Sequence, residues 1–178
     1  MMPQHIDRLI EAARLVPRAE AFDWDLAERT LGIEIPPDYR TLLDAGGAGL
    51  WFRYIRLYAP AERYTERNLL ESSGEFDDLK FSWEEGYSDP PDDLSNDARL
   101  IPWASTTTGE NLYWRTDADA PADTYPIYLE SADGDEWERF DMSVTDLLVG
   151  ILRGDVQSEL FSQRELRVDE VFRPYDEQ

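Results

Sequence analysis

The sequence has no cysteine, one histidine and one lysine among its 178 residues. Without cysteine the chain has no disulfide, no thiolate ligand for zinc and no thiol nucleophile. The only histidine, His5, excludes metal sites that need two histidines. It lies close to the start of the chain, where we expect a solvated side chain. Any catalysis would therefore have to use carboxylates, hydroxyl groups, Lys80 or arginines.

Long apolar runs are also missing, and so is an excess of positive charge. No apolar stretch approaches the roughly 20 residues that a membrane-spanning helix needs, and the first residues lack the pattern of a secretory signal. The 39 acidic residues against 17 basic ones give a net charge of −22. Such acidity disfavours direct binding to nucleic acid or to an anionic membrane. We therefore expect a cytoplasmic protein that contacts neither.

Hydrophobic residues make up 42% of the chain and aromatic residues 12%, including six tryptophans. This content is sufficient for a hydrophobic core, and the length predicts a single domain over residues 1–178. The charge is unevenly distributed. Residues 61–150 contribute −17 to the net charge, whereas residues 1–60 contribute only −2. We interpret the middle of the chain either as a solvated acidic surface or as a surface directed at a basic partner.

The spacing of apolar residues and the positions of proline, glycine and helix-capping residues predict an α+β fold. It has short N-terminal helices, a mostly antiparallel twisted sheet and C-terminal helices. Short turns between the later strands exclude crossover helices and hence a parallel sheet. The expected helices cover about 4–16, 24–31, 37–46, 60–71, 143–153 and 155–166. The expected strands cover 50–58, 99–104, 111–115, 125–130 and 136–140. Asp133-Gly134 is a favoured hairpin turn between the last two strands.

Two regions depart from this regular pattern. Residues 72–97 combine Pro90-Pro91, two glycines and many acids, and we expect an acidic insertion or loop with a short strand at 79–83. From about residue 167 the chain becomes a polar C-terminal tail.

Three blocks of residues, in this order, resemble the SUKH superfamily. The first has Trp24, Ala27-Glu28, Leu31-Gly32, Ile35-Pro36, Asp38-Tyr39-Arg40, Leu42-Leu43 and the bend at 46–49. The second has Ile55, Leu57, 101–106 and 109–114, and the third has Ser143, Leu147, Leu148 and Leu152. The resemblance covers about residues 20–155 and is interrupted by the insertion. The SUKH superfamily includes fungal cell-wall-synthesis regulators and bacterial immunity proteins that neutralise polymorphic toxins.

The resemblance implies an α+β fold and a protein-binding role, with a binding face that differs between members. It supplies no catalytic residue to carry over. The hypothesis is a non-enzymatic immunity protein that binds a cognate toxin, one with a basic, nuclease-like surface, as a monomer or weak homodimer. Basic nuclease toxins must hold phosphates, so an acidic inhibitor is complementary to them. The alternative within the family is a regulatory or scaffold protein with a physiological partner.

Acids that alternate with aromatics suit a basic partner, because the aromatics provide desolvated anchors and the charge speeds encounter. The candidate partner-binding residues are Trp83, Glu84, Glu85, Tyr87, Asp117, Asp119, Asp133, Asp135 and Glu136. No catalytic, cofactor-binding or metal-binding residue is assigned, and no cofactor is expected.

Two chemical alternatives remain weaker. A glycan hydrolase would need two carboxylates about 5–10 Å apart, for example among Asp133, Asp135, Glu136 and Glu138, with Trp114 and Trp137 as sugar platforms. Calcium binding at 117–123 lacks the glycine and the final glutamate of the usual loop.

Overall fold

The computed structural model describes residues 3–60 and 67–175 of the chain. Its helices are α1 (Pro3–Ala13), α2 (Trp24–Leu31), α3 (Pro37–Gly46), α4 (Glu75–Glu84) and α5 (Val144–Arg153). Its strands are β1 (Gly49–Trp51), β2 (Ile55–Leu57), β3 (Arg99–Thr106), β4 (Asn111–Thr116), β5 (Ile127–Glu130), β6 (Trp137–Phe140) and β7 (Phe172–Pro174). Two short 3-10 helices, η2 (Leu69–Gly74) and η3 (Ala122–Thr124), lie between them.

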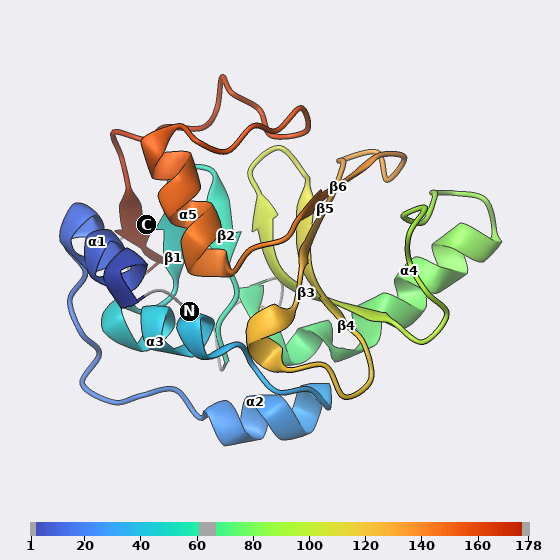
Figure 1. Cartoon of the computed structure of the whole chain (residues 1–178), viewed down its shortest axis with the longest axis horizontal. Helices are drawn as coiled ribbons and strands as arrows, with labels where there is room; N and C mark the ends of the chain where they lie inside the picture. The colour runs from blue at the N-terminus through green and yellow to red at the C-terminus, as the bar shows by residue number, and fades with distance from the viewer. Residues whose placement is uncertain (1–2, 61–66, 176–178) are drawn as a thin grey trace.

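The strands form one sheet in the order β6-β5-β4-β3-β2-β1-β7, and every neighbouring pair is antiparallel. Strands β1 to β6 therefore follow one another as a meander, and β7 returns from the C-terminal end to pair with β1. Figure 1 shows α5 on one side of strands β3 to β6 and α4 on the other. The predicted α+β class is confirmed.

The helices begin and end at the capping, proline and glycine residues that the sequence indicates. Gly32 and Gly154 adopt left-handed backbone angles, with φ of 71° and 77°, directly after α2 and α5. Glycine reaches this conformation without steric cost and so ends a helix. The Ser143 side chain accepts a hydrogen bond from the Asp146 amide and caps α5, as expected. Pro37 is the first residue of α3.

The main core lies between α2, α3, α5 and one face of the sheet. At its centre the Tyr39 ring contacts Trp114 edge-on, with 4.9 Å between ring centroids, and Trp114 stacks on Trp103. The Tyr39 hydroxyl donates to the backbone carbonyl of Tyr58. A buried side chain of this size stabilises the fold by about 1.5–3 kcal/mol, so these three rings are a main source of stability.

Two polar contacts join the N-terminal helices to α5. The buried Asp38 carboxylate at the start of α3 accepts hydrogen bonds, each 3.0 Å, from the backbone amide and hydroxyl of Thr145. His5 on α1 contacts the Asp146 carboxylate through its Nδ1 atom, so this ring is not the freely solvated side chain expected from the sequence. Residues more than 100 positions apart are thereby held together.

A second, smaller core covers the other face of the sheet. Phe76 on α4 packs with Leu100, Tyr113 and Tyr128, which alternate along β3, β4 and β5 with the residues of the main core. The predicted strand at 79–83 is wrong, because these residues belong to α4. Leu79, Phe81 and Trp83 alternate as in a strand, but Phe76, Leu79 and Trp83 also have helical spacing. The apolar face of the sheet selects the helical arrangement.

The predicted strand at 50–58 is two strands joined by a tight turn. Phe52 and Arg53 both have positive φ, 55° and 54°, without a glycine or asparagine to signal a turn. Contacts from the distant C-terminal segment hold this turn. The Phe52 amide donates to the Val171 carbonyl at 2.9 Å, and Arg53 forms an ion pair with Glu170. The segment described from the sequence as a polar tail thus contributes β7 and these contacts.

One predicted helix is wrong, and another is described only in part. Residues 155–166 form turns and bends instead of a helix, and Glu138 on β6 accepts hydrogen bonds from Ser158 and the Leu160 amide there. The helix expected over about 60–71 falls partly on residues 61–66, which lie outside the described residues. Its end overlaps the 3-10 helix η2.

The two phenylalanines of α4 test whether this helix is a structural layer. Phe76 is 8% exposed and Phe81 is 57% exposed. We expect Phe76→Ala to lower the free energy of unfolding by about 3 kcal/mol because it leaves a cavity against the sheet. The matched variant Phe81→Ala should change it by less than about 0.5 kcal/mol. Urea denaturation measures both, and equal effects would show that α4 does not cover the sheet.

Gly49 tests the pairing of β7 with β1. A Cβ atom at this position would lie 2.5 Å from the Arg173 carbonyl oxygen and would overlap the Phe172 ring. We expect Gly49→Ala to reduce stability by about 1–3 kcal/mol, because β7 must move away. A Cβ atom at Gly74 meets nothing within 4 Å, so Gly74→Ala is the control. A stable Gly49→Ala protein with native melting would contradict the pairing.

Candidate functional site

A groove with a volume of about 1200 Å³ lies between α4, the loop that follows it, and strands β5 and β6. Four aromatic residues line it, namely Phe76, Trp83, Tyr128 and Trp137. The Trp83 and Trp137 rings meet edge-on, with 6.3 Å between their centroids. The groove is therefore built on the second core, at the edge where α4 and β6 face each other.

The loop at 85–98 forms one wall of the groove, and hydrogen bonds hold it against the β5–β6 turn. The Trp137 indole Nε1 donates to the Asp89 carbonyl at 2.7 Å, and the Asp89 amide donates to the Gly134 carbonyl at 3.1 Å. The Ser82 and Ser88 hydroxyls share a further hydrogen bond of 2.7 Å. This part of the acidic insertion is thus a fixed wall with its backbone anchored at both sides.

The groove carries a strong excess of negative charge. Its lining includes eight carboxylates but only two cations, Lys80 and Arg139. Lys80 forms an ion pair with Asp77, and its ammonium group lies 5.0 Å from the Phe76 ring centroid. Six of the carboxylates have no ion pair or side-chain hydrogen bond with any described residue. They are Glu84, Asp89, Asp92, Asp135, Glu136 and Glu159.

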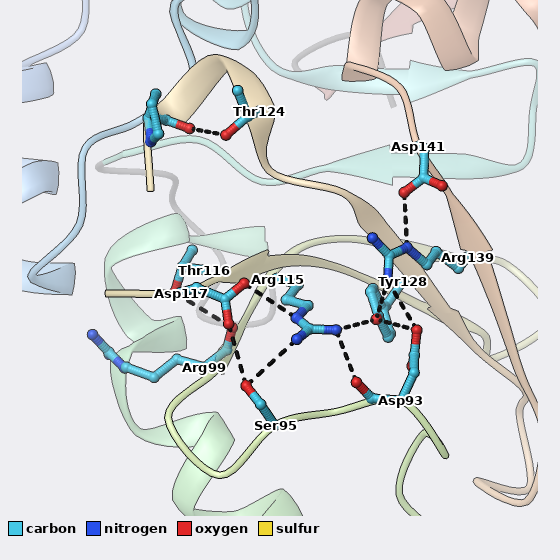
Figure 2. Close-up of polar contacts among 11 residues, drawn as sticks. Asp93, Ser95, Arg99, Arg115, Thr116, Asp117, Thr124, Tyr128, Arg139 and Asp141 are labelled. Carbon is cyan, nitrogen blue, oxygen red and sulfur yellow. Dashed lines mark hydrogen bonds and ion pairs between the residues drawn. The ribbon is translucent and has the colours of Figure 1, made fainter. Parts of the chain in front are cut away.

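The remaining cation, Arg139 on β6, is held by two carboxylates (Figure 2). Its guanidinium bonds to the Asp93 carboxylate at 2.9 Å and to the Asp141 carboxylate at 2.7 Å. It also lies 5.6 Å from the centroid of the Tyr128 ring. The hydrogen bonds to Asp141 and Asp93 raise the pKa of Arg139. Partial burial opposes ionisation of Asp93, but the bonds from Arg139 and Tyr128 lower its pKa.

A second guanidinium, that of Arg115 on β4, lies beside the first. It donates to the Tyr128 hydroxyl at 2.7 Å and to the Asp93 backbone carbonyl at 3.0 Å (Figure 2). The Tyr128 hydroxyl in turn donates to the Asp93 carboxylate at 2.8 Å. The two guanidinium groups therefore share the Tyr128 hydroxyl as an acceptor. Arg139 also bonds to the Asp93 carboxylate and Arg115 to the Asp93 carbonyl, so this network fastens the 85–98 loop to the sheet.

Four of the predicted partner-binding residues meet in this groove. Trp83 and Glu84 come from the end of α4, and Asp135 and Glu136 come from the β5–β6 turn. The sequence separates these pairs by about 50 positions, and the hydrogen bonds of the 85–98 loop bring them together.

Three others lie next to the groove. Glu85 caps the end of α4, and Tyr87 follows it with 74% of its surface exposed. Asp133 accepts hydrogen bonds from the Ser131 hydroxyl and the Asp135 amide in the β5–β6 turn, and these bonds lower its pKa. Asp133 therefore shapes the β5–β6 turn. Tyr87 presents an exposed aromatic ring close to the groove residues.

The last two predicted residues lie outside the groove. Asp117 follows β4, where it pairs with Arg115 at 3.3 Å and accepts a hydrogen bond from Ser95. Asp119 has a positive φ of 64° in the exposed turn that follows. The structure does not bring this pair together with Trp83 or Asp135.

Sequence reasoning missed Asp93, Tyr128 and Arg139 as groove residues. The available signal was the alternation of Trp137 and Arg139 on β6, which places both side chains on the same face of the sheet. No helix was predicted over 75–84, so nothing in the sequence indicated that this face lies beside α4.

The geometry bears on the weaker chemical alternatives. Trp114 is 1% exposed in the main core, so it offers no sugar platform. Within residues 3–60 and 67–175, no group of three or more His, Asp or Glu side chains is arranged to hold a metal ion. None of the helices in the same ranges has the length and apolar character required to span a membrane.

One buried acid lies under α4, away from the open groove. Glu130 is 5% exposed and accepts hydrogen bonds from Tyr113 at 2.8 Å and Asn111 at 3.2 Å. Burial raises the pKa of Glu130, and it also raises the pKa of Glu75 on α4, where Asp78 and Glu130 add negative charge. Proton binding to these two acids therefore favours the folded chain.

Glu130→Gln tests this effect. The pKa of Glu130 is higher in the folded chain than in the unfolded chain. The ionised carboxylate therefore destabilises the fold near neutral pH, and this destabilisation is lost as the pH falls through the folded pKa. We expect the variant to be more stable than wild type at about pH 7, and the difference in unfolding free energy to shrink towards about pH 5. Glu130→Ala, which also removes the acceptor for Tyr113, should be less stable than Glu130→Gln at both. A stability difference that grows with acidity would contradict this.

The family model SUKH_6, described as SMI1-KNR4 cell-wall, matches residues 23–148. The match covers more than half of the chain and extends from the residue before α2 into α5, so it includes six of the seven strands. Comparisons with curated proteins and with solved structures gave no match. On this evidence, and in agreement with the order of its sequence blocks and with its α+β fold, the chain belongs to the SUKH superfamily.

Proposed function

We propose that this protein is a non-enzymatic immunity protein, which binds a cognate toxin in the cytoplasm and covers the toxin's substrate-binding surface. The observation that carries the proposal is the groove, where eight carboxylates and four aromatic residues face solvent or line one hollow with only two cations. Desolvated aromatics provide binding energy, and a surface of one charge steers an oppositely charged partner.

The chemistry of the partner follows from this charge. A toxin that cleaves nucleic acid must carry arginines and lysines to hold phosphates. Such a surface is complementary to the groove and to the −17 of residues 61–150. A single copy of the protein that occupies the phosphate-binding surface would block substrate without a chemical step of its own, which agrees with the absence of a second histidine and of cysteine.

A second candidate function is a regulatory or scaffold protein that binds a physiological partner. The description of the matching family model, which refers to the cell wall, favours it. The two candidates differ in a direct observation. An immunity protein is encoded beside a toxin gene and protects cells from that toxin, whereas a regulator has no such neighbour and gives no protection.

Charge neutralisation in the groove tests the proposed function. We expect the protein to bind the toxin encoded beside its gene and to protect cells that express it. The triple variant Asp92→Asn, Asp135→Asn, Glu136→Gln should slow association about tenfold or more at low salt, because the steering field is lost. Stopped-flow or surface plasmon resonance measurements between about 50 and about 500 mM salt should show the difference shrinking as screening increases.

The control removes the same number of charges elsewhere. Asp7, Glu11 and Glu20 are exposed acids near the N-terminal helix, and the triple variant Asp7→Asn, Glu11→Gln, Glu20→Gln should associate nearly as fast as wild type. Absence of any binding to the neighbouring toxin would refute the immunity function. Equal slowing by the two triple variants would refute the assignment of the groove as the contact surface.

A further inference from the structure

The groove combines aromatic rings with carboxylates that have no cationic partner among the described residues. Trp83 and Trp137 are partly exposed in its lining. Glu84 follows Trp83 on α4, and Asp135 and Glu136 directly precede Trp137 in the β5–β6 turn. The face of a tryptophan ring attracts cations more strongly than that of any other aromatic residue. A cation held between a ring and a carboxylate gains from both contacts.

The part of the groove around Arg139 shows which cation this chemistry holds. There the guanidinium of Arg139 lies over the Tyr128 ring and bonds to two carboxylates, and the guanidinium of Arg115 lies 5.8 Å from the centroid of the same ring. Each group therefore meets the Tyr128 ring and at least one carboxylate. Around Trp83 and Trp137 the rings and the carboxylates recur, but the described residues provide no guanidinium in contact with either ring.

We infer that the part of the groove around Trp83 and Trp137 binds arginine side chains from a protruding segment of the partner protein. The inference rests on the proposed function and names the partner's contact chemistry. A planar guanidinium can stack on an indole and donate two parallel hydrogen bonds to a carboxylate, which an ammonium group cannot do. The groove therefore selects arginine over lysine at equal charge.

The shape of the groove favours an inserted segment over a flat surface. Its volume of about 1200 Å³ exceeds that of typical small-molecule sites. Its walls are α4 and the 85–98 loop, which the hydrogen bonds to Gly134 and Trp137 hold in place. Pro90 and Pro91 further restrict the backbone of this wall. Binding therefore requires little ordering of this side of the interface.

Peptide titration tests the inference with the full chain alone. The probes are three short glycine–serine peptides of identical spacing that carry arginine, lysine or uncharged citrulline. We expect the arginine peptide to bind about threefold to tenfold more tightly than the lysine peptide at the same salt concentration. The citrulline peptide should bind far more weakly than both. Calorimetry measures affinity, and tryptophan fluorescence reports contact with Trp83 and Trp137.

Three variants locate the binding. The groove variant Asp92→Asn, Asp135→Asn, Glu136→Gln should lose the arginine preference, and the Asp7, Glu11, Glu20 variant should keep it. Trp83→Phe preserves a ring against Phe76 and Trp137 while it reduces the cation attraction, so it should weaken the arginine peptide more than the lysine peptide. Circular dichroism and melting confirm that each variant is folded.

The outcomes separate this inference from the proposed function. Equal affinity for the arginine and lysine peptides, or binding that is unaffected by the groove variant, would overturn the inference. Protection from the toxin that persists in a groove variant without peptide binding would also overturn it, while the immunity function would stand on another surface. Selective arginine binding at the groove, measured without the toxin, would support the inference even if the neighbouring toxin failed to bind.

Discussion

The constraint on which the rest of the structure depends is that strands β3 to β5 carry large side chains on both faces. Trp103 and Trp114 point into the main core, whereas Leu100, Tyr113 and Tyr128 point to the opposite side and are also buried. An antiparallel sheet can leave one face to water only when that face is polar. This sheet needs two covering layers, and α4 with the 85–98 loop provides the second.

The second layer accounts for the place of the acidic residues. A short helix and a loop form this layer, and the groove lies between them and strands β5 and β6. Six of its carboxylates have no ion pair or side-chain hydrogen bond with a described residue, so their charge can vary at little cost to folding. The Arg115–Tyr128–Asp93–Arg139 network fixes this layer to the sheet. The groove and the position of its carboxylates thus both follow from the layer that covers the second face of the sheet.

The sequence predicted the fold better than the site. Ser143, Gly154, Gly32 and Pro37 carry local signals for helix ends, and such signals act over a few residues. The turn at Phe52 and Arg53 is held by distant segments, which no local pattern encodes. At 75–84 the local pattern fits both a strand and a helix, and the apolar face of the sheet selects the helix. Trp83, Glu84, Asp135 and Glu136 were predicted individually, but their meeting depends on α4. The Asp93–Arg139 ion pair belongs to the same groove, and its formation also depends on where the 85–98 loop lies.

The central claim is that the second layer is the surface that binds the partner. Hydrogen–deuterium exchange of the full chain, alone and with the toxin encoded beside its gene, tests it most directly. We expect slower exchange on binding in α4, in the 85–98 loop and in β6, with little change in α1 and β7. Protection confined to α1, β7 or the turn at Phe52 and Arg53 would contradict the claim.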